Sequence, residues 1–133
     1  MVCPYCHGKT KIINSRHQTR NNSTWRRRQC LKCEALITTK EEADYSRLWV
    51  LIDKNGRFNP FLQDKLFISL YDSLKHRRTA LNDARALLST VVAKLSKVCP
   101  DGQVERQELI DTTLSILTRF DKVATVYYRA YYS

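Results

Sequence analysis

Two pairs of cysteines constrain this sequence more than any other feature. Cys3 and Cys6 form one C-x2-C pair, Cys30 and Cys33 form a second, and 23 residues separate the two. Two residues between ligands allow a tight turn to aim both sulfurs at one ion, and two such turns complete a tetrahedral zinc shell. A closed shell leaves no position for a reactive water. The spacing therefore predicts one structural Zn²⁺ per chain.

Other interpretations of the cysteines stay open at this stage. The four could be unrelated buried thiols, and His7, which follows Cys6, could replace one sulfur ligand. In a reducing compartment, five cysteines in a short chain favour a metal site with one spare thiol over a set of disulfides. We expect that spare, Cys99, to be a small core or surface thiol.

Positive charge is concentrated around the cysteine pairs. The chain carries a net charge of +10, and residues 1–33 contribute +8 of it without a single Asp or Glu. A zinc ion with four thiolates contributes only about −2, so this segment stays strongly basic after metal binding. Such a local charge favours a polyanionic partner.

The region between the cysteine pairs is expected to form two strands, 11–16 and 24–29, joined by the turn residues 21–23. Alternation would place Arg26 and Arg28 on one face and Arg27 on the other. The planar fork of arginine suits phosphate or guanine. The candidate residues for binding double-stranded DNA are Arg16, Arg26, Arg27 and Arg28. A solvated charge run and an RNA-binding ribbon are the alternatives. Trp25 is expected to pack on the ribbon rather than stack on a base.

The remaining sequence predicts a second, mainly helical domain. Residues 48–52 read as a buried strand, and Asn55 and Gly56 as a type I′ hairpin turn. Apolar spacing predicts helices over 63–76 and 82–98, a third through Leu109 to Phe120, and a fourth over 123–132. Aromatic residues of the last helix are expected in the core or in an oligomer contact, with a ligand stack less favoured. The fold class is α+β, with a zinc ribbon over 1–46 and a hairpin on a four-helix bundle over 47–133.

A set of short segments spread over nearly the whole chain allows a comparison with known families. The set is Cys3-Pro4-Tyr5-Cys6, Ser15-Arg16, Arg26 through Cys33, Thr38-Thr39 with Glu41, Pro60-Phe61 with Lys65-Leu66, and Asp121 through Ala124. Together these segments resemble the NrdR family, bacterial repressors of ribonucleotide reductase genes that combine a zinc ribbon with an ATP-cone.

The resemblance implies a ribbon that binds paired operator sites and a cone that binds ATP or dATP. Nucleotide binding would change the homo-oligomer, formed through the cone, that can occupy DNA. The residues implied for the nucleotide site are Lys54, Asn55, Gly56, Arg57, Lys65 and Arg77.

The chain also departs from the family pattern. Asp53 stands where the family's cone usually has a lysine, and a carboxylate near a triphosphate would oppose binding. The alternative is therefore a DNA-binding adaptor whose degenerate cone has lost nucleotide control and acts through protein–protein pairing.

Two classes of protein fit the sequence poorly. It has no GxxxxGK[ST] loop and no paired catalytic carboxylates in a motif, so we do not expect an enzyme. No stretch approaches the roughly 20 apolar residues that cross a bilayer. We expect a cytoplasmic protein associated with the nucleoid and not with a membrane.

Overall fold

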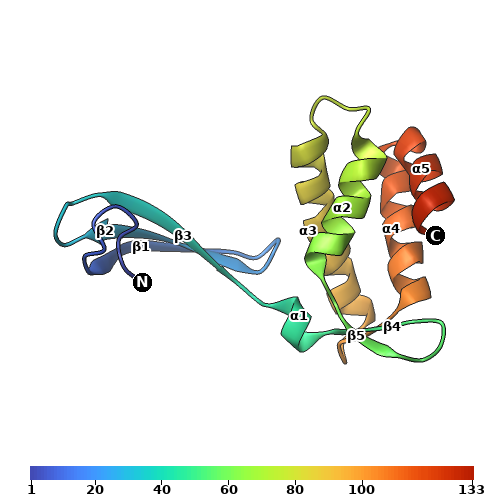
Figure 1. Cartoon of the computed structure of the whole chain (residues 1–133), viewed down its shortest axis with the longest axis horizontal. Coiled ribbons are helices and arrows are strands. Elements are labelled where there is room, and N and C mark those ends of the chain that lie inside the picture. The colour runs from blue at the N-terminus through green and yellow to red at the C-terminus, as the bar shows by residue number, and fades with distance from the viewer. The chain divides into compact units, whose positions relative to one another are not determined.

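The computed structural model describes residues 1–133 and divides into two compact units, Met1–Ala43 and Asp44–Ser133 (Figure 1). The sequence placed this boundary between residues 46 and 47. Strands alone form the first unit, and the second combines a small sheet with helices. The expected α+β class is confirmed. None of the helices is both long and apolar enough to cross a bilayer.

The first unit is an antiparallel three-stranded sheet in the order β1-β2-β3. Its strands are β1 (Thr10–Gln18), β2 (Ser23–Cys30) and β3 (Leu36–Glu42). The turn between β1 and β2 passes through Asn22, which adopts a left-handed conformation with φ of 49°. Asparagine tolerates this region better than most residues. The sequence did not predict β3, because only Ile37 of this polar segment is buried.

Strand β1 carries an irregularity that decides which face its later side chains occupy. Ile12 pairs with Arg28 and Asn14 pairs with Arg27, so Ile13 is an extra residue without a partner. A bulge of this kind reverses the alternation of side chains beyond it. As a result, Arg16 lies on the same face as Arg27 rather than on the face of Ile12 and Arg28.

The second unit begins with a single helical turn, α1 (Tyr45–Leu48), followed by the strands β4 (Val50–Ile52) and β5 (Phe58–Pro60). The sequence expected one strand over 48–52, but Asp44 caps α1 through the N–H of Ser46 and the strand starts only at Val50. A third strand, β6 (Gln103–Glu105), pairs parallel with β4, so the sheet order is β5-β4-β6. These three residues were too few to show a pattern in the sequence.

Four helices form the bundle of this unit: α2 (Gln63–Leu74), α3 (Ala80–Val98), α4 (Arg106–Phe120) and α5 (Lys122–Tyr132). Helix α2 packs against α3 and α5, and α4 packs against the same two, so the bundle is closed. Apolar residues at helical spacing fill it, with Leu70, Leu95 and Leu117 fully buried. The small sheet lies at one end of the helices (Figure 1), where Trp49 packs edge-on against Phe61.

The hairpin between β4 and β5 differs from the expected type I′ turn. That turn requires positive φ at both central residues, yet of Asn55 and Gly56 only the glycine has one, 76°. The loop has three residues, 54–56, and is closed by a hydrogen bond from the Asp53 N–H to the Arg57 carbonyl (3.1 Å); inside it, the Gly56 N–H donates to the Asp53 carbonyl (3.1 Å). Asp53 Oδ1 also accepts from the N–H groups of Asn55 (2.8 Å) and Arg57 (3.0 Å). The carboxylate of Asp53 therefore holds the loop in place by hydrogen bonds to its backbone.

Candidate metal centre and nucleic-acid interface

The two cysteine pairs have the same backbone geometry. In the first, the Tyr5 N–H donates to Cys3 Sγ (3.4 Å) and the His7 N–H to the Cys3 carbonyl (2.9 Å). In the second, the Lys32 N–H donates to Cys30 Sγ (3.3 Å). The Glu34 N–H there donates to the Cys30 carbonyl (3.2 Å). The residue after each pair, His7 or Glu34, adopts positive φ. Two equivalent turns thus present their sulfurs to a common point.

The four sulfurs fit a tetrahedral zinc ion. All four lie within 4.8 Å of one another; the sulfurs of Cys3 and Cys33 are 3.7 Å apart, and those of Cys6 and Cys30 are 3.4 Å apart. Four sulfurs bonded to Zn²⁺ at about 2.3 Å would stand about 3.8 Å apart. Gly8 makes this approach feasible, because an added Cβ there would lie 3.3 Å from the sulfurs of Cys6 and Cys30.

The electrostatics of the four clustered cysteines also favour a bound cation. The N–H groups of Cys33 and Lys32, both donating to Cys30 Sγ, lower the pKa of Cys30 to about 6 despite its desolvation. The N–H of Ala35 favours the Cys33 thiolate, yet desolvation and the neighbouring sulfurs raise the pKa of Cys33 to about 12. Four thiolates cannot share this space without a positive charge, and Zn²⁺ supplies it. His7 is exposed and stands outside the cluster.

The register of the sheet divides the predicted DNA-binding arginines between its two faces. Arg16 lies directly across from Trp25, and Trp25 lies across from Lys40. Arg27 follows on the same face, between Asn14 and Thr38. We call this surface the Trp25 face and define it by Asn14, Arg16, Trp25, Arg27, Thr38 and Lys40. Arg26 and Arg28 occupy the opposite face.

The arginines of the opposite face are less available to a partner. Arg26 Nη1 donates to Glu41 Oε2 (3.3 Å), and its side chain is 28% exposed. Arg28 lies between Ile12 and Ile37 in the register, and its Nε is buried with no hydrogen-bond partner. The stem of Arg28 therefore contributes to the packing of the ribbon.

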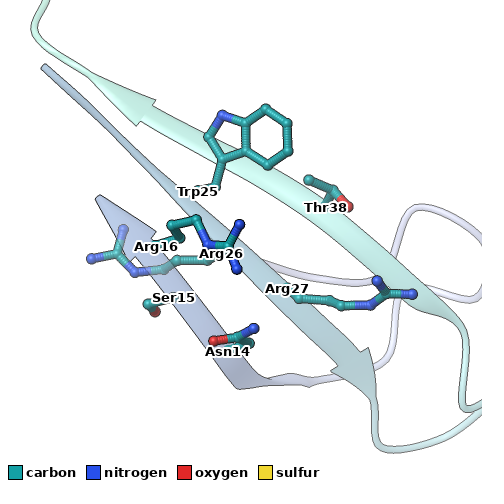
Figure 2. Close-up of a pocket in the computed structure, with 7 residues that line it drawn as sticks. All are labelled: Asn14, Ser15, Arg16, Trp25, Arg26, Arg27 and Thr38. Atoms are coloured by element: carbon teal, nitrogen blue, oxygen red, sulfur yellow. The ribbon is translucent and has the colours of Figure 1, made fainter. Parts of the chain in front are cut away.

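An open hollow of about 160 Å³ lies at the Trp25 face. Figure 2 shows its lining, which comes from all three strands: Asn14, Ser15, Arg16, Trp25, Arg26, Arg27 and Thr38. No acidic residue is among them. Sequence reasoning expected Trp25 to be packed on the ribbon, but the side chain is 45% exposed. It also missed Asn14, Thr38 and Lys40, because their place on this face depends on the bulge and on β3.

In the second unit, five of the six residues implied for a nucleotide site lie near the hairpin. Lys54, Asn55 and Gly56 form its exposed loop, and the exposed Arg57 follows directly. Lys65 lies in the first turn of α2, which follows β5. Arg77 stands apart from them. It follows the last turn of α2, a helix of 12 residues and thus about 18 Å long.

Arg77 is engaged by other side chains of the bundle. Its Nε donates to Asp83 (2.9 Å), its Nη1 donates to Asp121 (3.1 Å), and its guanidinium lies over the ring of Phe120, 4.6 Å from the centroid. The two carboxylates raise the pKa of Arg77 further above its usual range. The structure thus separates Arg77 from the hairpin and gives it intramolecular partners.

Comparisons with known proteins agree with the zinc-ribbon geometry. A family model described as the N-terminal domain of NrdR-like transcriptional repressors matches residues 1–41. The chain is 31% identical to a transcriptional repressor NrdR of Chlamydia pneumoniae, over 99% of this chain and 86% of the relative. The identity is 30% for the Chlamydia felis protein, with the same coverage. It is 27% for that of Chlamydia trachomatis serovar D, over 84% of the relative. Because the similarity extends through both units, the chain belongs to the NrdR family of zinc-ribbon transcriptional repressors, which are regulators and not enzymes.

Proposed function

We propose that this chain represses transcription by binding double-stranded DNA through its zinc-loaded ribbon, chiefly with Arg16 and Arg27. The observation that carries this proposal is the Trp25 face, where the two arginines stand on one surface and neither forms an ion pair. Arginines free of carboxylate partners can donate two parallel hydrogen bonds to phosphate or to guanine. Arg26 and Arg28 add positive potential from the opposite face.

Adenine nucleotide control is the second part of the proposal. Lys54, Arg57 and Lys65 bring three positive charges to the hairpin end of the bundle, where they can bind the phosphates of ATP or dATP. Asp53 does not oppose this, because its carboxylate is turned to the backbone of its own loop. We assign Arg77 to the support of the bundle rather than to the phosphates.

Oligomer formation through the cone is the third part. Helix α5 buries Ala124, Thr125 and Tyr128, yet its outward side carries another apolar stripe at helical spacing. The stripe consists of Val123, Val126, Tyr127, Ala130 and Tyr131, and Tyr131 is 71% exposed. Contiguous exposed apolar surface of this kind suits a protein contact. We propose that it pairs with a second copy of the chain, which would place two ribbons on paired operator sites.

Ribonucleotide reductase genes are the targets that family membership suggests, and the ribbon and cone would then connect nucleotide levels to their transcription. The competing function is the adaptor, in which the cone pairs with a protein and has lost nucleotide control. It is favoured by Asp53 in place of the family's usual lysine and by the engagement of Arg77 with Asp83 and Asp121.

One set of titrations tests these parts together. Zinc-loaded protein is titrated with ATP and with dATP while its mass and its binding to a duplex of a ribonucleotide reductase promoter are recorded. A sensor should change mass and duplex affinity when nucleotide is added. An adaptor should bind the duplex, but nucleotide should change neither its mass nor its duplex affinity. Equal affinity for the promoter and for an unrelated duplex would refute ribonucleotide reductase genes as the target.

A further inference from the structure

We propose that the hollow at the Trp25 face binds one unstacked nucleobase, so that the ribbon holds single-stranded or locally unpaired DNA in addition to duplex. This inference rests on the proposed DNA-binding function and goes beyond it by naming the form of DNA that the hollow takes. It is carried by the exposure of Trp25, by the groups around the hollow and by the charges beside it.

The ribbon does not use its largest apolar side chain in its core. That core consists of Cys3, Cys30 and Ile37, with Cys6 and Ala35 packed against them. Trp25 instead lies on an open sheet face, 45% exposed. An aromatic ring presented by a sheet is the arrangement with which several single-strand-binding domains stack bases.

Residues that can hydrogen-bond to a base edge line the hollow together with Trp25. Asn14 and Thr38 line the same hollow and belong to the Trp25 face, and they carry an amide and a hydroxyl. An amide can pair with both edge groups of adenine, and hydroxyls can donate or accept toward any base. The hollow, at about 160 Å³, has room for a ring system rather than for one or two waters.

Positive charge lies on both sides of the indole. Arg16 faces Trp25 from β1 and Lys40 faces it from β3. Two acidic residues of the sheet already have partners: Glu41 pairs with Arg26 of the opposite face (3.3 Å), and Glu42 pairs with Lys40 (3.4 Å), which offsets the charge of Lys40. Arg16 and Arg27 are therefore available to the phosphates on either side of a bound base.

The combination favours an unstacked base over an intact duplex. In a duplex, bases present only their edges to the grooves, whereas stacking on an indole requires the face of the base. Phosphate contacts alone would use the arginines equally well without an exposed tryptophan beside hydrogen-bonding groups.

The test is a fluorescence titration of the zinc-loaded full chain with a short oligothymidylate and, separately, with a mixed-sequence duplex. Trp49, the other tryptophan, is buried and provides a constant background. We expect the oligothymidylate to quench Trp25 and to bind about tenfold more weakly to Trp25→Ala, since stacking contributes on this scale. Trp25→Phe should recover most of the affinity. Ile12→Ala, an exposed apolar residue of the opposite face, is the matched control.

The outcomes separate this inference from the proposed function. A loss of oligothymidylate affinity in Trp25→Ala that is much larger than its loss of duplex affinity, with zinc content retained, supports the hollow as a base site, whereas equal losses of both affinities overturn it. Duplex binding by the parent chain without oligothymidylate binding, or equal oligothymidylate affinity for Trp25→Ala, overturns the inference and leaves the proposed function in place. If the chain binds neither oligothymidylate nor duplex, both the inference and the proposed function are overturned. Tighter binding of oligouridylate than of oligothymidylate would overturn DNA as the ligand of the hollow in favour of RNA.

Discussion

Asp121 accepts a hydrogen bond from Arg77 (3.1 Å) with the carboxylate that also begins helix α5. Its Oδ1 accepts from the N–H of Ala124 (2.9 Å), and His76 Nε2 lies 3.0 Å from Oδ2. The connection that follows α2 is thereby joined to the connection between α4 and α5, 44 residues later in the chain. One carboxylate thus serves as a helix cap and as a link between two ends of the bundle.

Replacing Arg77 should test whether it supports the bundle or binds nucleotide. We expect Arg77→Ala to lower the free energy of unfolding by about 1–2 kcal/mol, because two partly exposed ion pairs and a ring contact are lost. Denaturant unfolding measures this, and Arg78→Ala, an exposed neighbour without an ion pair, is the control. If Arg77→Ala left stability unchanged but abolished ATP binding, the arginine would belong to the nucleotide site instead.

Acid should weaken the same link. The capping N–H of Ala124, together with His76 and Arg77, lowers the pKa of Asp121 from 3.8 to about 2. Because the folded pKa lies below the unfolded one, the stabilisation is complete above about pH 4 and is lost as the pH falls toward 2. It amounts to roughly 2 kcal/mol. Asp121→Asn retains a capping oxygen. We expect it to be less stable than the parent near neutral pH, and its free energy of unfolding should change less between about pH 4 and pH 2.

The measurement should follow only the bundle, since zinc is also released by acid. In a Trp25→Phe background, Trp49 alone reports on the second unit, where it is buried. Asp64→Asn, an exposed carboxylate in the first turn of α2, is the control for a general change of charge. Equal pH slopes for Asp121→Asn and the parent chain would contradict the assignment.

Local patterns predicted much of this fold. The four helices appeared in the sequence because Leu70, Leu95, Leu117 and similar residues repeat at helical spacing and fill one core. The metal site appeared because a C-x2-C turn is determined by its own residues. The α1 turn, β3 and β6 did not appear, since they are short or mostly polar and exist through pairing with distant segments.

The nucleic-acid face shows the same limit. Alternation along β2 correctly separated Arg27 from Arg26 and Arg28. It could not place Arg16 beside Trp25, because that depends on the extra residue at Ile13 and on the register that follows it. The pairing of distant strands therefore determines which residues share the Trp25 face, whereas the positive charge of the ribbon is visible in the sequence alone.

Zinc removal should unfold the ribbon. The buried apolar cluster of the first unit is Cys3, Cys30 and Ile37, so metal ligation replaces a hydrophobic core that so few residues cannot build. We expect one zinc per chain by elemental analysis, its loss in Cys30→Ser, and loss of strand signal and duplex binding after chelation. Cys99→Ala, a buried thiol of the second unit, should keep its zinc. Full zinc content in Cys30→Ser would refute the site.

Charge removal should affect the two faces of the ribbon unequally. Arg16→Ala and Arg27→Ala should each weaken duplex binding and reduce the slope of log affinity against log salt by about 0.9, the effect of one lost phosphate contact. Arg26→Ala should change the slope less, because Arg26 is already paired with Glu41. If an arginine reads a guanine, its loss should instead cost about 1–3 kcal/mol of discrimination at one base pair.

Arg28→Ala is informative in a different way. Arg28 lies between Ile12 and Ile37 in the register. We therefore expect Arg28→Ala to lower the stability of the ribbon. The zinc content of this variant is measured before its DNA binding is interpreted. A salt slope that fell for Arg26→Ala and Arg28→Ala but not for the Arg16 and Arg27 variants would place DNA on the opposite face.

The last prediction concerns Asp53 and its effect on nucleotide binding. A carboxylate directed at a triphosphate would repel it, but Asp53 Oδ1 accepts the N–H groups of Asn55 (2.8 Å) and Arg57 (3.0 Å). We therefore expect the carboxylate to organise the loop that presents Lys54 and Arg57. Asp53→Asn removes the charge and keeps an acceptor, whereas Asp53→Lys removes both hydrogen bonds, at a cost of about 1 kcal/mol each.

Calorimetry with ATP on these three proteins separates charge from loop geometry. If the loop matters, Asp53→Asn should bind within a few-fold of the parent, and Asp53→Lys should bind more weakly despite its added positive charge, because the loop loses its order. If instead both variants bound ATP and the parent did not, the charge of Asp53 would disable the cone and the adaptor would become the better description. Absence of binding by all three would remove the nucleotide site and leave α5 as the remaining basis for a role of the cone in assembly.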